Sequence, residues 1–108
     1  MTLELPQPIA AYFQADQGDG LSVSECFTDG ASVTDEGNTY NGRDAIRDWK
    51  AEASGKYTYT VAPSAIEEVD GKIVVTADVA GNFPGSPIDL RYFFVIDGDK
   101  IASLEIKS

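Results

Sequence analysis

The N-terminal part of the chain spaces its apolar residues as a helix does. Pro6 and Pro8 suit the first turn of a helix. Residues at i, i+3, i+4 and i+7 then share one face, which is apolar except for a phenol and a carboxylate: Ile9, Tyr12, Phe13 and Asp16. We therefore predict a first helix that Gly18 and Gly20 end.

Two further helices follow from capping and spacing. Ser22 with Glu25 has the pattern of a capping box and predicts a short helix carrying Cys26 and Phe27, ended by a turn at 28–30. A third helix is predicted between Gly42 and Gly55. Its apolar face carries Ile46, Trp49 and Ala53, and Asp44 lies near its positive end.

The strands have a period of two. Residues 31–35 and 39–40 predict a short hairpin before the third helix, and from Tyr57 onward alternation dominates. Asp70-Gly71 and Asp97-Gly98 each lie between apolar runs, which predicts two hairpins joined by a turn-rich loop at 82–87. Helices followed by strands indicate an α+β fold with a strongly curved, mostly antiparallel sheet and the helices on one face.

The strand Ile88 to Ile96 is apolar on both faces. One face presents Asp89, Arg91, Phe93 and Val95, and the other presents Ile88, Leu90, Tyr92, Phe94 and Ile96. Three helices can cover only one face of such a sheet. We expect the second face to meet another copy of the chain in a homodimer.

Composition narrows the chemistry. The chain has 108 residues, no histidine, one cysteine and a net charge of −10. The length fits a single domain, 1–108. Without histidine or a second thiol, serine-histidine and cysteine-histidine catalysis and thiolate metal clusters are excluded, and we expect no metal and no cofactor. The acidic charge disfavours binding to nucleic acid. No apolar run approaches the roughly 20 residues of a membrane span. We therefore expect a soluble, cytoplasmic protein that binds neither nucleic acid nor membrane.

Four stretches and the order of elements resemble the nuclear transport factor 2-like superfamily, and within it the SnoaL-like polyketide cyclases and ketosteroid isomerases. The stretches are Ile9-Ala10-Ala11-Tyr12-Phe13, Ala31-Ser32-Val33-Thr34-Asp35, Gly42-Arg43-Asp44-Ala45-Ile46-Arg47-Asp48-Trp49 and Asp89-Leu90-Arg91-Tyr92-Phe93. The resemblance implies a cone-shaped roll enclosing a pocket for a small hydrophobic or carbonyl-containing molecule. This fold hosts isomerases, cyclases, dehydratases and non-enzymatic binders.

The resemblance to ketosteroid isomerase implies three catalytic residues. Asp35 matches its general base, and Tyr12 and Asp89 match the donors of its oxyanion hole. Proton abstraction next to a carbonyl needs an ionised carboxylate and neutral donors, and a chain without histidine must use carboxylates and phenols for both.

Arg91 departs from that pattern. It lies two residues from Asp89, on the same side of the strand. A guanidinium favours the ionised form of a nearby carboxyl, and an ionised Asp89 cannot donate. Two interpretations follow: a structural Asp89–Arg91 pair, or a pocket in which Arg91 anchors an anionic or strongly polar ligand.

Aromatic side chains can line the same pocket. The candidates are Phe27, Trp49, Tyr57, Tyr59, Phe83 and Phe93, of which Trp49 lies on the helix expected to close the cone. Each of them can equally serve as core. The sequence thus favours a cofactor-independent isomerase, cyclase or dehydratase. The alternative is a non-catalytic ligand-binding or dimeric interaction module of the same fold.

Overall fold

Three helices precede and interrupt the strands of one curved sheet. The computed structural model describes residues 4–16, 20–56 and 58–107, with the backbone alone at 20–21 and 53–56. The helices are α1 (Gln7–Ala15), α2 (Gly20–Ser24) and α3 (Arg43–Lys56). The strands are β1 (Phe27–Asp35), β2 (Asn38–Asn41), β3 (Tyr59–Val69), β4 (Lys72–Gly81), β5 (Ile88–Asp97) and β6 (Lys100–Lys107).

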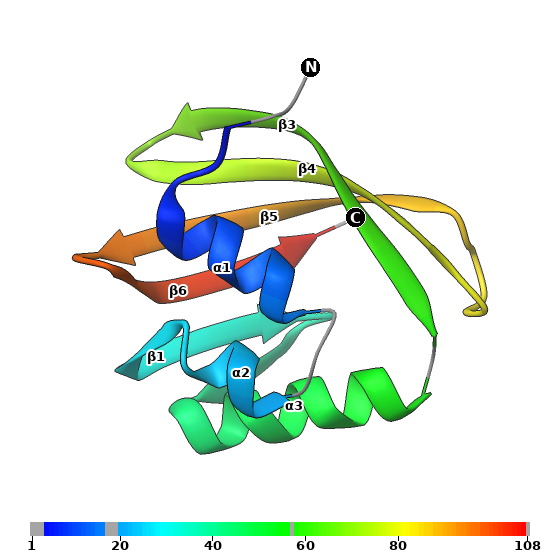
Figure 1. The fold of residues 1–108 in the computed structure, drawn as a ribbon, viewed down its shortest axis with the longest axis horizontal. Helices are drawn as coiled ribbons and strands as arrows, with labels where there is room; N and C mark the ends of the chain where they lie inside the picture. The colour runs from blue at the N-terminus through cyan, green and yellow to red at the C-terminus, as the bar shows by residue number, and fades with distance from the viewer. Residues whose placement is uncertain (1–3, 17–19, 57, 108) are drawn as a thin grey trace.

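The sheet has the order β2-β1-β6-β5-β4-β3, and every neighbouring pair is antiparallel except β1 with β6. All three helices lie on its inner side, where α1 crosses β5 and β6 and α3 runs beyond β1 (Figure 1). This confirms the predicted α+β fold with a strongly curved, mostly antiparallel sheet. All three predicted hairpins are present: Asp35 pairs with Asn38, Val69 with Lys72, and Asp97 with Lys100.

The core lies between α1 and the inner face of the sheet. Tyr12 and Phe13 pack edge-to-face on Phe94, with ring centroids 5.6 and 6.0 Å apart, and both also contact the Tyr92 ring. Ile46 of α3 is fully buried in the same cluster. The aromatic contacts fix the angle at which α1 crosses the strands, and that crossing sets where Tyr12 points.

The second helix differs from its prediction. The helix α2 ends at Ser24, and Phe27 begins β1, which runs through the residues 28–30 that we predicted as a turn. Phe27 is fully buried and pairs with Ile101, whose amide donates to the Cys26 carbonyl at 2.9 Å. Strand pairing and burial of Phe27 therefore outweigh the local capping preference of Ser22 and Glu25.

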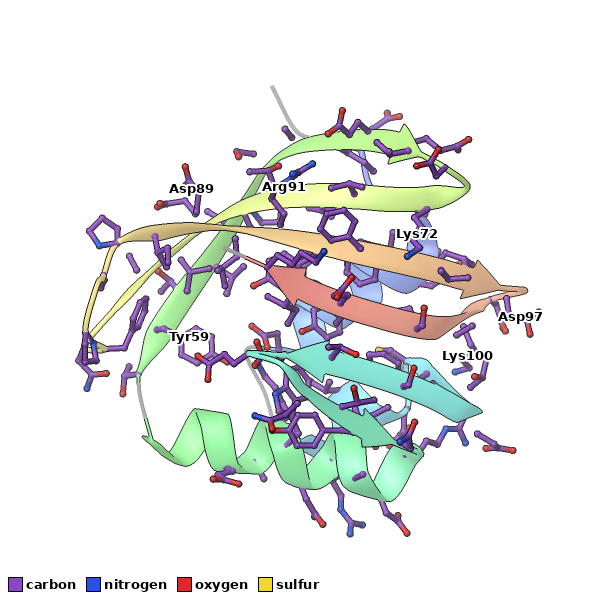
Figure 2. The ribbon with its side chains drawn as sticks, turned by 180° about the vertical axis from the view of Figure 1, so that it is seen from behind. Tyr59, Lys72, Asp89, Arg91, Asp97 and Lys100 are labelled. Atoms are coloured by element: carbon purple, nitrogen blue, oxygen red, sulfur yellow. The ribbon has the colours of Figure 1, made fainter. Side chains whose placement is uncertain are left out.

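The face of β5 that points inward is the opposite of the one we predicted. Tyr92 and Phe94 are buried under α1, whereas Asp89 and Arg91 are exposed on the outer face, seen from behind in Figure 2. Arg91 pairs with Glu67 at 3.6 Å instead of Asp89. Since the helices cover the face of Tyr92, the charged residues of β5 take the solvent side.

No helix in the described part of the chain has both the length and the apolar character needed to cross a membrane.

Candidate active site

A cavity of about 660 Å³ opens between α1, α3 and the curved strands. Its wall on one side is apolar and comes from β4, β5, β6 and the β4–β5 loop: Val79, Phe83, Pro84, Ile88, Leu90 and Ile106. The other side carries polar groups from five separate elements, α1, β1, α3, β3 and β5: Tyr12, Asp35, Trp49, Lys50, Tyr59 and Tyr92. The cavity can therefore hold a small, mostly apolar molecule that has a polar group at one end.

Asp35 is the last residue of β1, just before a turn in which Glu36 and Gly37 both adopt positive φ. The Trp49 indole N–H donates to Asp35 Oδ2 at 3.1 Å and fixes the carboxylate's orientation. Burial raises the pKa of Asp35, the Trp49 hydrogen bond opposes that rise, and the charge of Glu36 adds to it. The result is an oriented carboxylate with a proton affinity above its ordinary value.

Two phenols that line the same cavity stay protonated. Tyr12 is 1% exposed, and burial raises its pKa well above the ordinary value, with Tyr92, Tyr59 and Asp35 adding to the effect. Burial also raises the pKa of Tyr92, and again Tyr59 and Asp35 contribute. These two hydroxyls therefore act as hydrogen-bond donors, and the negative charge of Asp35 contributes to the raised pKa of both.

A buried lysine is the main feature that sequence reasoning missed. Lys50 follows Trp49 on α3, is 5% exposed, and forms an ion pair with Asp16 at the end of α1. Its ammonium also donates to the Tyr59 hydroxyl. Burial lowers the pKa of Lys50 to about 8.

Helical spacing contained the signal for this pair. Lys50 lies four residues after the buried Ile46, and Asp16 lies four residues after Tyr12. Each charge therefore falls on the apolar face of its own helix. Opposite charges on two apolar faces indicate a buried ion pair, because a charge is seldom buried alone.

The cavity brings together half of the predicted site residues. Tyr12, Asp35, Trp49, Tyr59 and Phe83 line it. Phe27 instead belongs to the core beneath Tyr12, with ring centroids 6.0 Å apart. Tyr57 lies outside the described residues.

Three predicted site residues lie on the outer face of β5. Asp89 is exposed there and lines no part of the cavity, so its predicted placement as a donor in the pocket is wrong. Arg91 pairs with Glu67 and stacks over the Phe93 ring at 5.2 Å. Both interpretations of Arg91, as the partner of Asp89 and as the anchor of a ligand in the pocket, are therefore wrong. Phe93 likewise lines no part of the cavity.

Comparison with protein-family models and with curated protein sequences finds no match. Solved structures do match. A candidate polyketide cyclase from Sinorhizobium meliloti is 39% identical, with a TM-score of 0.89 and 95% of each chain covered. A hypothetical protein from Catenulispora acidiphila with a ketosteroid isomerase-like fold, solved with trimethylamine, is 19% identical, with a TM-score of 0.85, covering 97% of this chain and 87% of that one.

A third match is SalBIII, an epoxide hydrolase/cyclase-like enzyme with a role in pyran ring formation in the polyether salinomycin. It is 23% identical, with a TM-score of 0.74, covering 92% of this chain and 85% of SalBIII. The last two matches share the fold, and the first also shares sequence along nearly its whole length. By its similarity to the candidate polyketide cyclase over nearly the whole length, the chain belongs to the family of that protein, and its fold is nuclear transport factor 2-like.

Proposed function

We propose that this protein is a cofactor-independent acid–base catalyst of the isomerase, cyclase or dehydratase type, acting on a small carbonyl compound. One observation carries the proposal. The Asp35 carboxylate, oriented by Trp49, faces the same largely apolar cavity as the protonated Tyr12 hydroxyl.

In this mechanism Asp35 removes a proton from the carbon next to the carbonyl. The electron pair moves to the carbonyl oxygen, where Tyr12 donates a hydrogen bond to the developing negative charge. Tyr92 is the second donor, in place of Asp89. Lys50 donates to the Tyr59 hydroxyl and orients that side chain at the cavity wall. Apolar walls strengthen these interactions because little water competes for the oxygen.

The apolar wall indicates the substrate class. Six apolar side chains face the acid–base groups, so a flat or ring-bearing molecule with one carbonyl fits better than a multiply charged one. The similarity to a candidate polyketide cyclase, and the fold shared with a cyclase-like enzyme, both favour ring-forming or enolising chemistry.

Exchange of α-hydrogens in heavy water tests the proposal. With 2-tetralone, a flat bicyclic ketone, we expect the protein to speed deuterium incorporation, followed by NMR. Asp35→Asn should lose about 10²–10⁴-fold of that acceleration while keeping affinity for the ketone. Asp89→Asn makes the same change at an exposed carboxylate outside the cavity, so it is the matched control and should retain the rate. If several ketones bind without any acceleration of exchange, the protein is a binding module instead.

We also propose that the outer face of the sheet forms a homodimer. On that face Arg91 and Lys107 lie over the Phe93 ring at 5.2 and 5.4 Å, and Glu67 pairs with Arg91. A face that mixes an aromatic centre with both charges suits a self-complementary contact. Light scattering should give twice the monomer mass, and Phe93→Asp should halve it. A monomer at micromolar concentration would refute the dimer.

The location that we propose is the cytoplasm. Its support is the unpaired thiol of Cys26, which fits a reducing compartment.

A further inference from the structure

The amine of Lys50 lies where a neutral ligand can meet it. Lys50 lines the cavity although its side chain is only 6% exposed, and its Nζ lies 5.5 Å from the Trp49 ring centroid and 5.0 Å from that of Tyr59. Bulk water thus has little access to the amine. A carbonyl compound that fills the cavity lies beside the Lys50 side chain.

The groups around Lys50 are those that amine chemistry requires. Asp16, which directly follows α1, forms an ion pair with the nitrogen and is placed to take up its proton, and the Tyr59 hydroxyl of β3 also contacts the nitrogen. Asp35, Tyr12 and Tyr92 line the same cavity. An amine desolvated in an apolar pocket is a nucleophile toward carbonyl carbon when a neighbouring group takes up its proton.

We propose that Lys50 forms an imine with small apolar aldehydes or ketones that enter the cavity. This activity goes beyond enolisation by Asp35, and it uses the cavity without depending on that residue. The two proposals therefore fail separately.

The step balances within the site. The Lys50 ammonium first passes a proton to Asp16, and the neutral amine then attacks the carbonyl carbon. A carbon–nitrogen bond forms while the carbonyl pair goes to oxygen. One nitrogen proton moves to that oxygen, giving a carbinolamine. The carbon–oxygen bond then breaks and the hydroxyl leaves as water with the proton held by Asp16. The products are a protonated imine and one water molecule, with no oxidant or reductant.

The lowered basicity of Lys50 supports this assignment. With a pKa of about 8, roughly one Lys50 amine in ten is unprotonated at neutral pH. An ordinary lysine, with a pKa near 10.4, is unprotonated on the order of one time in a thousand. A lower pKa also weakens an amine as a nucleophile, so the net advantage over a surface lysine is about tenfold.

Reductive trapping tests the proposal on the intact folded protein. The probes are propanal and benzaldehyde, with cyanoborohydride to reduce the imine to a stable secondary amine. Digestion and mass spectrometry then give the extent of modification at each lysine. We expect Lys50 to be modified about tenfold faster than Lys72, an exposed residue at the start of β4. In denaturant this preference should disappear.

Two variants control for the route and the residue. Lys50→Arg keeps a cation beside Asp16 but carries no amine, and should lose trapping at this position alone. Leu90→Trp fills the cavity from the opposite wall and should suppress modification of Lys50 without changing that of Lys72.

The proposal is overturned if neither aldehyde modifies Lys50 in the folded parent protein and the other lysines are modified in proportion to their solvent exposure. That result needs no variant, so it holds even if Lys50→Arg fails to fold. Loss of exchange activity in Asp35→Asn with trapping retained at Lys50 separates this proposal from the proposed function.

Discussion

Replacing Lys50 with Met tests the buried ion pair. The substitution keeps the length and volume of the side chain and removes its charge, so packing beside Trp49 changes little. It leaves the Asp16 carboxylate, whose side chain is 5% exposed, without the cation that faces it. Asp16 Oδ1 has no hydrogen-bond partner among the described residues, so Lys50 alone compensates that oxygen.

Removing one partner of a buried pair costs about 3–5 kcal/mol, because an uncompensated charge remains in the interior. A domain of this size has roughly 5–15 kcal/mol of stability in total. We therefore expect Lys50→Met to remove a large part of the free energy of unfolding and to lower Tm by more than about 10 °C.

A double-mutant cycle in urea separates the pair from packing. The double variant Asp16→Leu with Lys50→Met replaces both charges by apolar groups, which is often neutral or stabilising by about 1–4 kcal/mol relative to the parent. We expect it to recover most of the loss seen in Lys50→Met. A single-variant cost below about 1 kcal/mol, or a double variant whose cost equals the sum of the singles, would refute the reasoning.

Three further outcomes follow from the same contacts. Trp49→Phe removes the hydrogen bond that lowers the pKa of Asp35, so an NMR titration should find that pKa higher than in the parent, and an unchanged value would contradict the assignment. Because burial raises the pKa of Asp35 above 3.8, the folded parent binds more protons than the unfolded chain between pH 3.8 and the raised value. The free energy of unfolding therefore falls as pH rises through this range. Asp35→Asn removes this dependence, so urea unfolding from pH 3 to 7 should move the stability difference in the variant's favour as pH rises; movement the other way excludes a raised pKa. Gly81→Ala would place a methyl group against the Thr58 carbonyl and 2.7 Å from Tyr59 Cα, so we expect a loss of about 1–3 kcal/mol and weaker ketone binding, and an unchanged Tm would show that the close approach is absent.

Local chemistry was sufficient to predict most of the fold. Asp-Gly pairs fix tight hairpins because few other residues adopt positive φ in the turn, and Asp70 and Gly71 both do so here. The order of helices and hairpins then leaves few ways to bury the apolar faces. The α2 region failed because Ser22 and Glu25 offer only a local preference, whereas Phe27 gains a fully buried position in β1.

The faces of β5 could not be separated by periodicity alone. Alternation distinguishes two faces of a strand, but both faces of this one carry large apolar side chains, including Tyr92 on one and Phe93 on the other. The resemblance to ketosteroid isomerase then assigned Asp89 to the pocket. Two charges at alternate positions, Asp89 and Arg91, were the better guide to the solvent side, because charged groups are seldom buried without partners.

About half of the candidate site could be predicted from the sequence. Tyr12, Asp35 and Trp49 lie where helix spacing and the end of a strand placed them, and all three line the cavity. Lys50 was not predicted as a site residue because a lysine on a helix is ordinarily exposed to solvent. Its partner Asp16 lies 34 positions earlier in the chain, so no local window contains both charges.

Lys50 offers this chain, which has no histidine, a side chain that titrates near neutral pH. A histidine titrates near neutral pH by its own chemistry, whereas a lysine does so only when burial destabilises its charged form. Here α1 and α3 bury Lys50 beside an apolar cavity, and burial lowers its pKa to about 8. The same desolvation raises the pKa of Asp35. The cavity thus brings an acid and a base toward neutrality from opposite directions, which acid–base chemistry near pH 7 requires in a chain without histidine.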